Sequence, residues 1–134
     1  MGKWAILTQS GGRLDQQMQS LNALWTFHHK FDQLVLLSEA SLTVLLPAPR
    51  GAEPPPLATY HIQRAPIQTD TCGLIPMGKV QQVHTEGLRW ECDGCMAMGG
   101  LVSSSNEMTG SSVQVQTSGD LLWTASVELT WGNQ

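Results

Sequence analysis

Residues 123–131 read Trp-Thr-Ala-Ser-Val-Glu-Leu-Thr-Trp, and this stretch decides the fold class. Apolar residues occupy positions 123, 125, 127, 129 and 131, while Thr, Ser and Glu occupy the positions between them. A period of two places alternate side chains on opposite faces of a β-strand, whereas a helix would scatter them around its circumference. The stretch therefore predicts an amphipathic strand with one face on a core and the other facing water or a polar partner.

One principal helix is predicted, near the N-terminus, after a short apolar run at 4–8 that is typical of a buried strand. Its apolar stripe follows spacings of three and four residues and consists of Leu14, Met18, Leu21, Leu24, Trp25 and His28. Ser10 is the expected N-terminal cap, because its hydroxyl can accept an orphan backbone amide. The helix is expected to end near Lys30, where a cation suits the C-terminal dipole.

Strands are predicted for the rest of the chain. Apolar runs at 34–37 and 42–46 have strand length, and five prolines within 47–56 indicate an extended surface loop. A hairpin is expected at 80–92, with its turn at 86–87, Thr85 opposite Leu88 and Val83 opposite Trp90. A second hairpin is expected to join 113–116 to the strand that starts at Leu121. The serine-rich stretch 98–106 is interpreted as a flexible loop, since no strained elbow or positioned base accompanies its serines.

These elements predict an α+β fold, in which one amphipathic helix packs on a mainly antiparallel sheet of about six to eight strands. Residues 1–134 are expected to form a single domain, with the proline-rich surface loop at 47–56. This loop is interpreted as a connector, with recognition by an aromatic groove as the alternative.

The charge pattern excludes one class of function. Charged residues make up only 13% of the chain, and the net charge is −4. The low charge indicates either burial against a partner or a neutral surface rich in Ser, Thr and Gln. No cation follows Arg89, and the seven Lys and Arg residues form no cluster. We therefore expect no stand-alone binding of nucleic acid, and contact with RNA that is at most indirect or minor.

The location is predicted to be cytoplasmic. No basic region followed by a long apolar run marks a secretory signal, and no window approaches the roughly 18 apolar residues that span a bilayer. Three cysteines, an odd number, argue against a disulfide framework.

The cysteines and histidines suggest a zinc site that we consider and reject. Cys92 and Cys95 form a Cys-x-x-Cys pair, and Cys72 and His84 are the nearby candidates for completing four ligands. Their spacing matches no familiar zinc module, and no helix follows the pair as a redox motif would require. We expect ordinary buried or partly buried cysteines and no metal. The adjacent His28 and His29 point roughly 100° apart on a helix and cannot share one ion.

The Gln-Ser-Gly-Gly turn at 9–12 lies between a strand and a helix, where backbone amides attract anions. It contains neither a dinucleotide-binding nor a P-loop motif, so a tight turn explains its glycines. We predict no catalytic residue and no cofactor. A phosphate-holding turn at Thr8 to Arg13 remains the basis of the alternative function below.

Two short patterns resemble CRISPR-associated proteins. Val83-His-Thr-Glu-Gly-Leu-Arg-Trp90 and Asp120-Leu-Leu-Trp-Thr124 resemble strands of the small accessory protein of type III-D CRISPR effector complexes, with Thr124 where that family has glycine. The resemblance implies a non-enzymatic subunit of a ribonucleoprotein complex that contacts other protein subunits. Residues 4–40 resemble the opening of CRISPR-associated Rossmann-like domains that sense cyclic oligoadenylates, although no further strand–helix units follow.

The leading prediction is thus a non-enzymatic interaction subunit of a cytoplasmic multiprotein complex, a CRISPR type III effector in antiviral defence. The alternative is a small domain that senses a nucleotide or cyclic oligoadenylate. The residues expected to contact protein partners are Trp123, Trp131, Trp90, Arg89 and Arg50. If the strand at 123–131 lies at a sheet edge, its unpaired amides are a further docking place.

Overall fold

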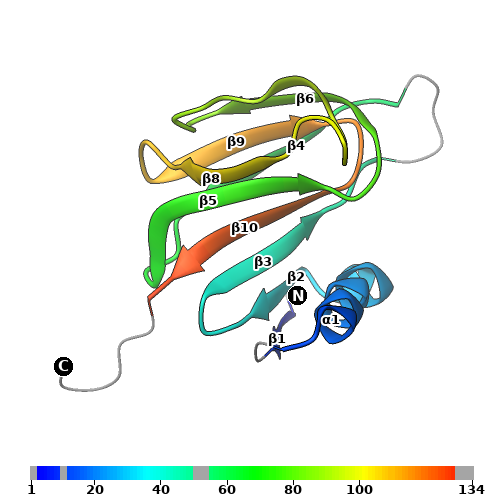
Figure 1. Ribbon diagram of the computed structural model, residues 1–134, viewed down its shortest axis with the longest axis vertical. Helices are drawn as coiled ribbons and strands as arrows, with labels where there is room; N and C mark the ends of the chain where they lie inside the picture. Colours follow the sequence, from blue (N-terminus) through cyan, green and yellow to red (C-terminus); the bar gives the residue numbers. More distant parts are fainter. Residues whose placement is uncertain (1–2, 10–11, 50–54, 129–134) are drawn as a thin grey trace.

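The computed structural model describes residues 3–9, 12–49 and 55–128. Among them, one α-helix and ten strands form two packed sheets, which confirms the mainly antiparallel α+β fold (Figure 1). The helical elements are α1 (Leu14–Phe27) and a following 3-10 turn (His28–Lys30). The strands are β1 (Trp4–Thr8), β2 (Gln33–Leu37), β3 (Ser41–Leu46), β4 (Ala58–Gln63), β5 (Gln68–Pro76), β6 (Val80–Glu86), β7 (Asp93–Met96), β8 (Ser103–Glu107), β9 (Ser112–Thr117) and β10 (Leu121–Val127).

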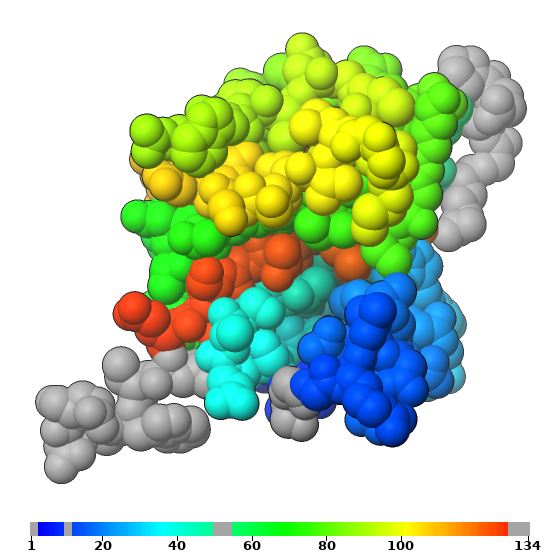
Figure 2. Space-filling view, in the orientation of Figure 1, coloured from blue at the N-terminus to red at the C-terminus, as the bar shows by residue number. Residues whose placement is uncertain are grey.

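The larger sheet has the strand order β1-β2-β3-β10-β5-β8, and the smaller sheet has the order β4-β9-β6-β7. Only the β1–β2 pair is parallel, because α1 carries the chain from the end of one strand back to the start of the next. The other neighbouring strands are antiparallel. Figure 2 shows that α1 covers one end of the outer face of the larger sheet and leaves β3, β10, β5 and β8 open beside it.

The predicted strand at 123–131 is confirmed over its described part, because Trp123, Ala125 and Val127 are buried. The residues at 129–131, including Trp131, lie outside the described residues. The condition for docking at this strand, a position at the sheet edge, is not met, since β10 runs in the middle of the larger sheet between β3 and β5. Its backbone amides are paired on both sides, so this strand offers no edge for a partner.

Two hydrophobic clusters lie on opposite faces of the larger sheet. Between the sheets, Trp123 packs among residues such as Leu74, Val83 and Val115. On the other face, Leu24 of α1 packs with β2, β3 and β10 residues such as Leu34 and Leu122. The alternation of β10 thus sends Trp123 into one cluster and Leu122 into the other, while Thr124 and Ser126 farther along the outer face are half-buried.

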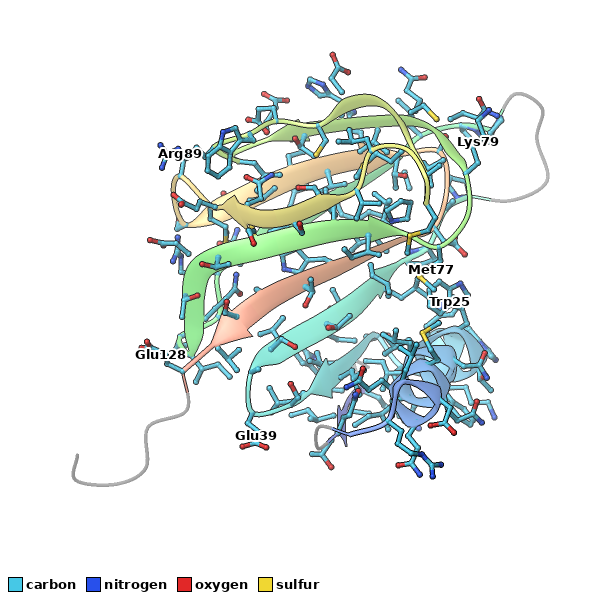
Figure 3. All side chains as sticks on the ribbon, viewed as in Figure 1. Trp25, Glu39, Met77, Lys79, Arg89 and Glu128 are labelled. Atoms are coloured by element: carbon cyan, nitrogen blue, oxygen red, sulfur yellow. The ribbon has the colours of Figure 1, made fainter. Side chains whose placement is uncertain are left out.

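The N-terminal helix is confirmed, but not all residues of its predicted apolar stripe are buried. Leu24 is fully buried, whereas Leu14 at the first turn is 70% exposed and Met18 is 43% exposed. The predicted cap, Ser10, lies outside the described residues, and Arg13 occupies the N-cap position without a side-chain cap bond. Trp25 ties the helix to the sheet, because its indole N–H donates to Asp120 at 2.9 Å. Trp25 and Met77 line one hollow of about 440 Å³ (Figure 3).

Both predicted hairpins need correction. β9 pairs with β4 and β6, while β10 lies in the other sheet, so the turn between them crosses from one sheet to the other. In the first hairpin Val83 pairs with Gly94 and not with Trp90, because the connection between β6 and β7 is longer than two residues. The serine-rich stretch is not a loop throughout, since its second half belongs to β8.

Among the described residues no helix is long and apolar enough to cross a membrane.

Candidate functional site

The connection between β6 and β7 presents a tryptophan on the surface. Leu88 in this connection is buried and forms an isolated bridge with Met108, which holds the segment against the core. The two following side chains, Arg89 and Trp90, point outward, and Trp90 is 53% exposed. The guanidinium carbon of Arg89 lies 4.7 Å from the centroid of the Trp90 ring, which is cation–π geometry. Figure 3 shows Arg89 at one extremity of the smaller sheet.

Asn106 of β8 clamps the backbone of Trp90 and is itself 2% exposed. The Trp90 N–H donates to the Asn106 Oδ1 at 3.2 Å, and the Asn106 Nδ2 donates to the Trp90 carbonyl at 2.8 Å. The same Nδ2 donates to the Ser103 hydroxyl at 2.9 Å, and Oδ1 also accepts the Glu107 N–H at 2.8 Å. These four bonds use the two donors and two acceptor sites of the amide, so its orientation is fixed.

Glu91 closes the turn from the other side. One carboxylate oxygen accepts the Thr85 hydroxyl at 2.6 Å and the Leu88 N–H at 3.3 Å, and the other accepts the Gly87 N–H at 2.9 Å. Gly87 has φ +111°, and a Cβ there would lie 2.7 Å from the Ser112 carbonyl oxygen. A side chain would be strained at this position and would meet the neighbouring backbone, so the turn that carries Trp90 depends on glycine here.

A bulge in β8 sets the direction of Ser103 and Asn106. The register with β5 shifts between Cys72, which pairs with Asn106, and Leu74, which pairs with Ser103. Ser105 takes up the extra length with φ +53°, an uncommon conformation for a residue other than glycine. Gly73 lets the two strands approach, because a Cβ at that position would lie 2.8 Å from the Ser103 carbonyl oxygen. Bulges of this kind re-aim side chains and are frequent beside binding sites.

The result is a rigid aromatic platform. We call Trp90 with Arg89, Ser103 and Asn106 the Trp90 platform. A large apolar ring at the surface contributes little to the core, yet its backbone is held as firmly as that of a buried residue. Such a preorganised ring can stack on a flat aromatic ligand with little loss of conformational entropy on binding.

The other predicted contact residues lie elsewhere. Trp123 is 1% exposed, so its side chain cannot contact a partner. Its indole N–H is buried and has no hydrogen-bond partner among the described residues. Trp123 also lines a hollow of about 790 Å³ between β3 and β4, together with Val44 and Tyr60. Arg50 and Trp131 lie outside the described residues.

The four candidate metal ligands are not brought together. Cys72 and Cys92 are buried and Cys95 is exposed, so the Cys-x-x-Cys pair points in two directions. His84 instead approaches Asp93, with 3.5 Å between its Nδ1 and the carboxylate oxygen. Among the described residues no group of three or more His, Cys, Asp and Glu side chains is placed to hold a metal ion. Burial raises the pKa of the Cys72 thiol to about 11 and raises the pKa of the Cys92 thiol.

At the turn before α1, Arg13 and Asp15 form a two-pronged ion pair on the surface, with 3.0 and 3.1 Å between their atoms. Asp15 also accepts the Gln16 N–H at 2.9 Å, so its carboxylate sits at the helix start. Residues 10 and 11 of the predicted phosphate turn lie outside the described residues.

The sequence pointed to Arg89 and Trp90 as contacts for protein partners, but it did not reveal the residues that hold them. Ser103 and Asn106 both lie in the stretch that was predicted to be a flexible loop. The available signal was Asn at the end of a serine run, since a buried Asn requires polar partners. The partner in this case is 16 residues away, which no local pattern shows.

A family model described as "Thiamin pyrophosphokinase, vitamin B1 binding domain" matches residues 59–122. The chain is 38% identical over 124 residues to thiamine pyrophosphokinase 1 of Oryza sativa subsp. japonica, covering 91% of this chain and 44% of that protein. It is 36% identical over 122 residues to thiamine pyrophosphokinase 1 of Arabidopsis thaliana, covering 90% of this chain and 42% of that protein. The chain therefore spans less than half the length of these curated relatives.

Solved structures share the fold. The thiamin pyrophosphokinase of Candida albicans matches with a TM-score of 0.73 and 21% identity, over 96% of this chain and 45% of that one. The yeast thiamin pyrophosphokinase matches with a TM-score of 0.72 and 23% identity, over 91% of this chain and 39% of that one. The structural matches extend beyond residues 59–122 and include most of the N-terminal elements, because they cover more than nine tenths of the chain.

These findings overturn the functional predictions made from the sequence. The resemblance to a type III-D CRISPR accessory protein is wrong, as are the antiviral and ribonucleoprotein roles, because the relatives are thiamine pyrophosphokinases. The expectations of a non-enzymatic chain and of protein subunits as its partners fail for the same reason. The nucleotide-sensing alternative also finds no support. Of the two short patterns that suggested CRISPR proteins, 83–90 lies within the matched residues 59–122 and 120–124 overlaps their end.

Proposed function

We propose that this chain is the thiamine-binding part of a thiamine pyrophosphokinase, and that the Trp90 platform receives the vitamin. The observation that carries the proposal is an exposed tryptophan whose backbone is clamped by a buried asparagine within the matched residues 59–122. Thiamine contains two flat heteroaromatic rings, so a fixed indole face is suited to stack on one of them. Asn106 holds the backbone of Trp90 from the buried side, and Ser103 accepts one of the amide bonds that fix its orientation.

The transfer of a pyrophosphoryl group is proposed for the whole protein and not for this chain alone. The relatives are more than twice as long as the part that this chain matches. The exposed face of β1 supports contact with further structure, because Trp4 is 74% exposed and Ile6 is 61% exposed. Parallel strands are normally covered on both faces, and α1 covers only one.

The test measures thiamine binding by calorimetry on the wild-type chain and on Trp90→Ala. We expect binding to weaken by about tenfold in the variant, because one aromatic stack is lost, while the melting temperature stays within a degree or two of the wild type. Trp4→Ala is the matched control, since it removes another exposed tryptophan distant from the platform in sequence. Equal affinity of Trp90→Ala and wild type for thiamine would show that the platform is not the site.

Two expectations from the sequence remain proposals. We propose that residues 1–134 fold as one unit, which a single cooperative urea transition seen by both fluorescence and circular dichroism would support. We also propose a cytoplasmic location. The three free cysteines fit a reducing compartment, and localisation of the tagged protein by microscopy tests it.

A further inference from the structure

One face of the parallel β1–β2 pair is packed, and the other face is open. On the packed face, Ala5 and Leu7 of β1 lie against the cluster that contains Leu24 of α1. Because side chains alternate along a strand, Trp4 and Ile6 lie on the opposite face. They are 74% and 61% exposed, so the smaller sheet does not extend over them. Within the described residues this pair therefore has one covering layer, where parallel strands usually have two.

The open face continues into the hollow of about 790 Å³ beside β4. Trp4 and Val35 line this hollow from the β1–β2 pair. Val44 of β3 and Tyr60 of β4 line it from the neighbouring strands. Since β4 is the edge strand of the smaller sheet, the hollow lies where the smaller sheet ends and the larger sheet continues. We call Trp4, Ile6, Val35, Val44 and Tyr60 the Trp4 groove.

The same hollow contains a buried hydrogen-bond donor without an acceptor. Trp123 lines it and is 1% exposed, and its indole N–H has no hydrogen-bond partner among the described residues. Buried polar groups in complete structures are nearly always paired, so this N–H points to a partner other than the residues that line the hollow. The large apolar side chains exposed beside it, Trp4 and Ile6, are typical of a docking surface. Both observations indicate that a further segment packs on this face.

We propose that the Trp4 groove receives an amphipathic α-helix from the part of a thiamine pyrophosphokinase that lies outside the match to this chain. The inference rests on the proposed function, in which this chain is one part of a longer enzyme. Such a part has ample length, because the match covers only 44% and 42% of two relatives. A helix is the element that fits, since helices cover the faces of parallel strands and α1 already does so on the other face.

The strands set the length of this helix. β1 and β2 have five residues each, and a strand rises about 3.3 Å per residue, so the pair is roughly 17 Å long. A helix rises about 1.5 Å per residue, so about 11 residues, or three turns, cover the pair. Its apolar side chains would recur at spacings of three and four residues and face Trp4 and Val35, while its polar side chains face water.

The test compares the chain alone with a chimera, in which residues 1–134 replace the matched part of thiamine pyrophosphokinase 1 of Oryza sativa subsp. japonica. Ile6→Cys is labelled with iodoacetamide in both proteins, and peptide mass spectrometry follows the rate of labelling. Met98→Cys is the matched control, because Met98 is 62% exposed and lies in the connection between β7 and β8. Cys95 is an internal reference in each sample, since it is exposed. Circular dichroism and a cooperative urea transition show whether the chimera is folded.

We expect Ile6→Cys to react about tenfold more slowly in the folded chimera than in the chain alone, because reaction then requires the helix to open locally. Met98→Cys should react at a similar rate in both proteins. Equal rates for Ile6→Cys in the two proteins would overturn the proposal. Slow reaction in the chain alone that speeds up on dilution would also overturn it, since a second copy of the chain would then cover the groove.

A measurement on the chain alone tests the groove if the chimera does not fold. The dye 1-anilinonaphthalene-8-sulfonate binds exposed apolar surface. Ile6→Glu should reduce dye binding by about threefold, because it places a charge in the apolar patch, whereas Met98→Glu should leave it nearly unchanged. Equal dye binding by Ile6→Glu and the wild type would overturn the groove as an apolar docking surface. Failure of the wild-type chain to bind thiamine would instead refute the proposed function, while the labelling rates and dye binding still report on the groove.

Discussion

Trp90 and Trp123 are the same residue type in opposite circumstances. Trp123 is 1% exposed, packs in the centre of the core and leaves its indole N–H without a partner among the described residues. Trp90 is 53% exposed, yet its backbone N–H and carbonyl are both held by one buried side chain. Packing in the core accounts for a large apolar side chain at position 123. It does not account for one at the exposed position 90. An exposed ring on a backbone that is held in place is the better candidate for binding a ligand.

The largest effect is expected at the buried member of the pair. Trp123→Ala should lower the free energy of unfolding by about 3–5 kcal/mol, because it empties a large volume in a packed core. Trp123→Phe should cost clearly less, since it keeps an aromatic ring and loses an N–H that has no partner. Urea denaturation monitored by circular dichroism measures both. Equal destabilisation of the two variants would contradict this account, because it would mean that the retained ring contributes nothing.

The next largest effect on stability is expected at the β8 bulge, which sets the direction of Ser103 and Asn106. Gly73→Ala would place a methyl group 2.8 Å from the Ser103 carbonyl oxygen and should cost about 1–3 kcal/mol of stability. It should also weaken thiamine binding, because Ser103 and Asn106 must move. Gly78→Ala is the matched control, since nothing lies within 4 Å of a Cβ there. Urea midpoints and calorimetry are the measurements, and equal behaviour of the two alanine variants would contradict this account of the bulge.

The smallest effect on stability is expected from the buried thiol of Cys72. Burial raises the pKa of the Cys72 thiol from 9.0 to about 11, so the folded chain holds that proton where the unfolded chain has lost it. This contribution to stability is present below pH 9 and is lost as the pH rises from about 9 to about 11. Cys72→Ala should therefore show a shallower decline in stability over that interval than the wild type. A decline of the same slope in both proteins would exclude Cys72 as its cause.

Alkylation separates buried from exposed thiols in the native chain. Iodoacetamide at pH 8 should modify Cys95 first and leave Cys72 and Cys92 unmodified until the chain unfolds, because only Cys95 is exposed. Peptide mass spectrometry identifies the modified residue, and a urea-unfolded sample provides the control in which all three react. Early modification of Cys72 would show that the core opens readily.

Part of the candidate site was readable in the sequence, and part was not. Gly-Leu-Arg-Trp at 87–90 indicated the turn, because glycine permits it, but the predicted pairing put Trp90 on the same face as Leu88, whereas Leu88 is buried and Trp90 is exposed. The roles of Asn106 and Glu91 were not readable. Asn106 pairs with Trp90 only because β8 folds beside the β6–β7 connection, and that placement depends on sheet order. The prediction of a β9–β10 hairpin failed for a similar reason, since short spacing does not determine whether two strands share a sheet.

The sequence by itself determined the alternation from Trp123 to Val127, the helix at 14–27 and the strands at 34–37 and 42–46, because periodicity is a local property. Only the tertiary structure decided that β10 lies between β3 and β5 and that its two faces meet two different cores. It also decided that Trp90 is exposed and that Trp123 is buried. Burial and clamping depend on strands that are distant in sequence, and the period of a single strand carries no information about its neighbours.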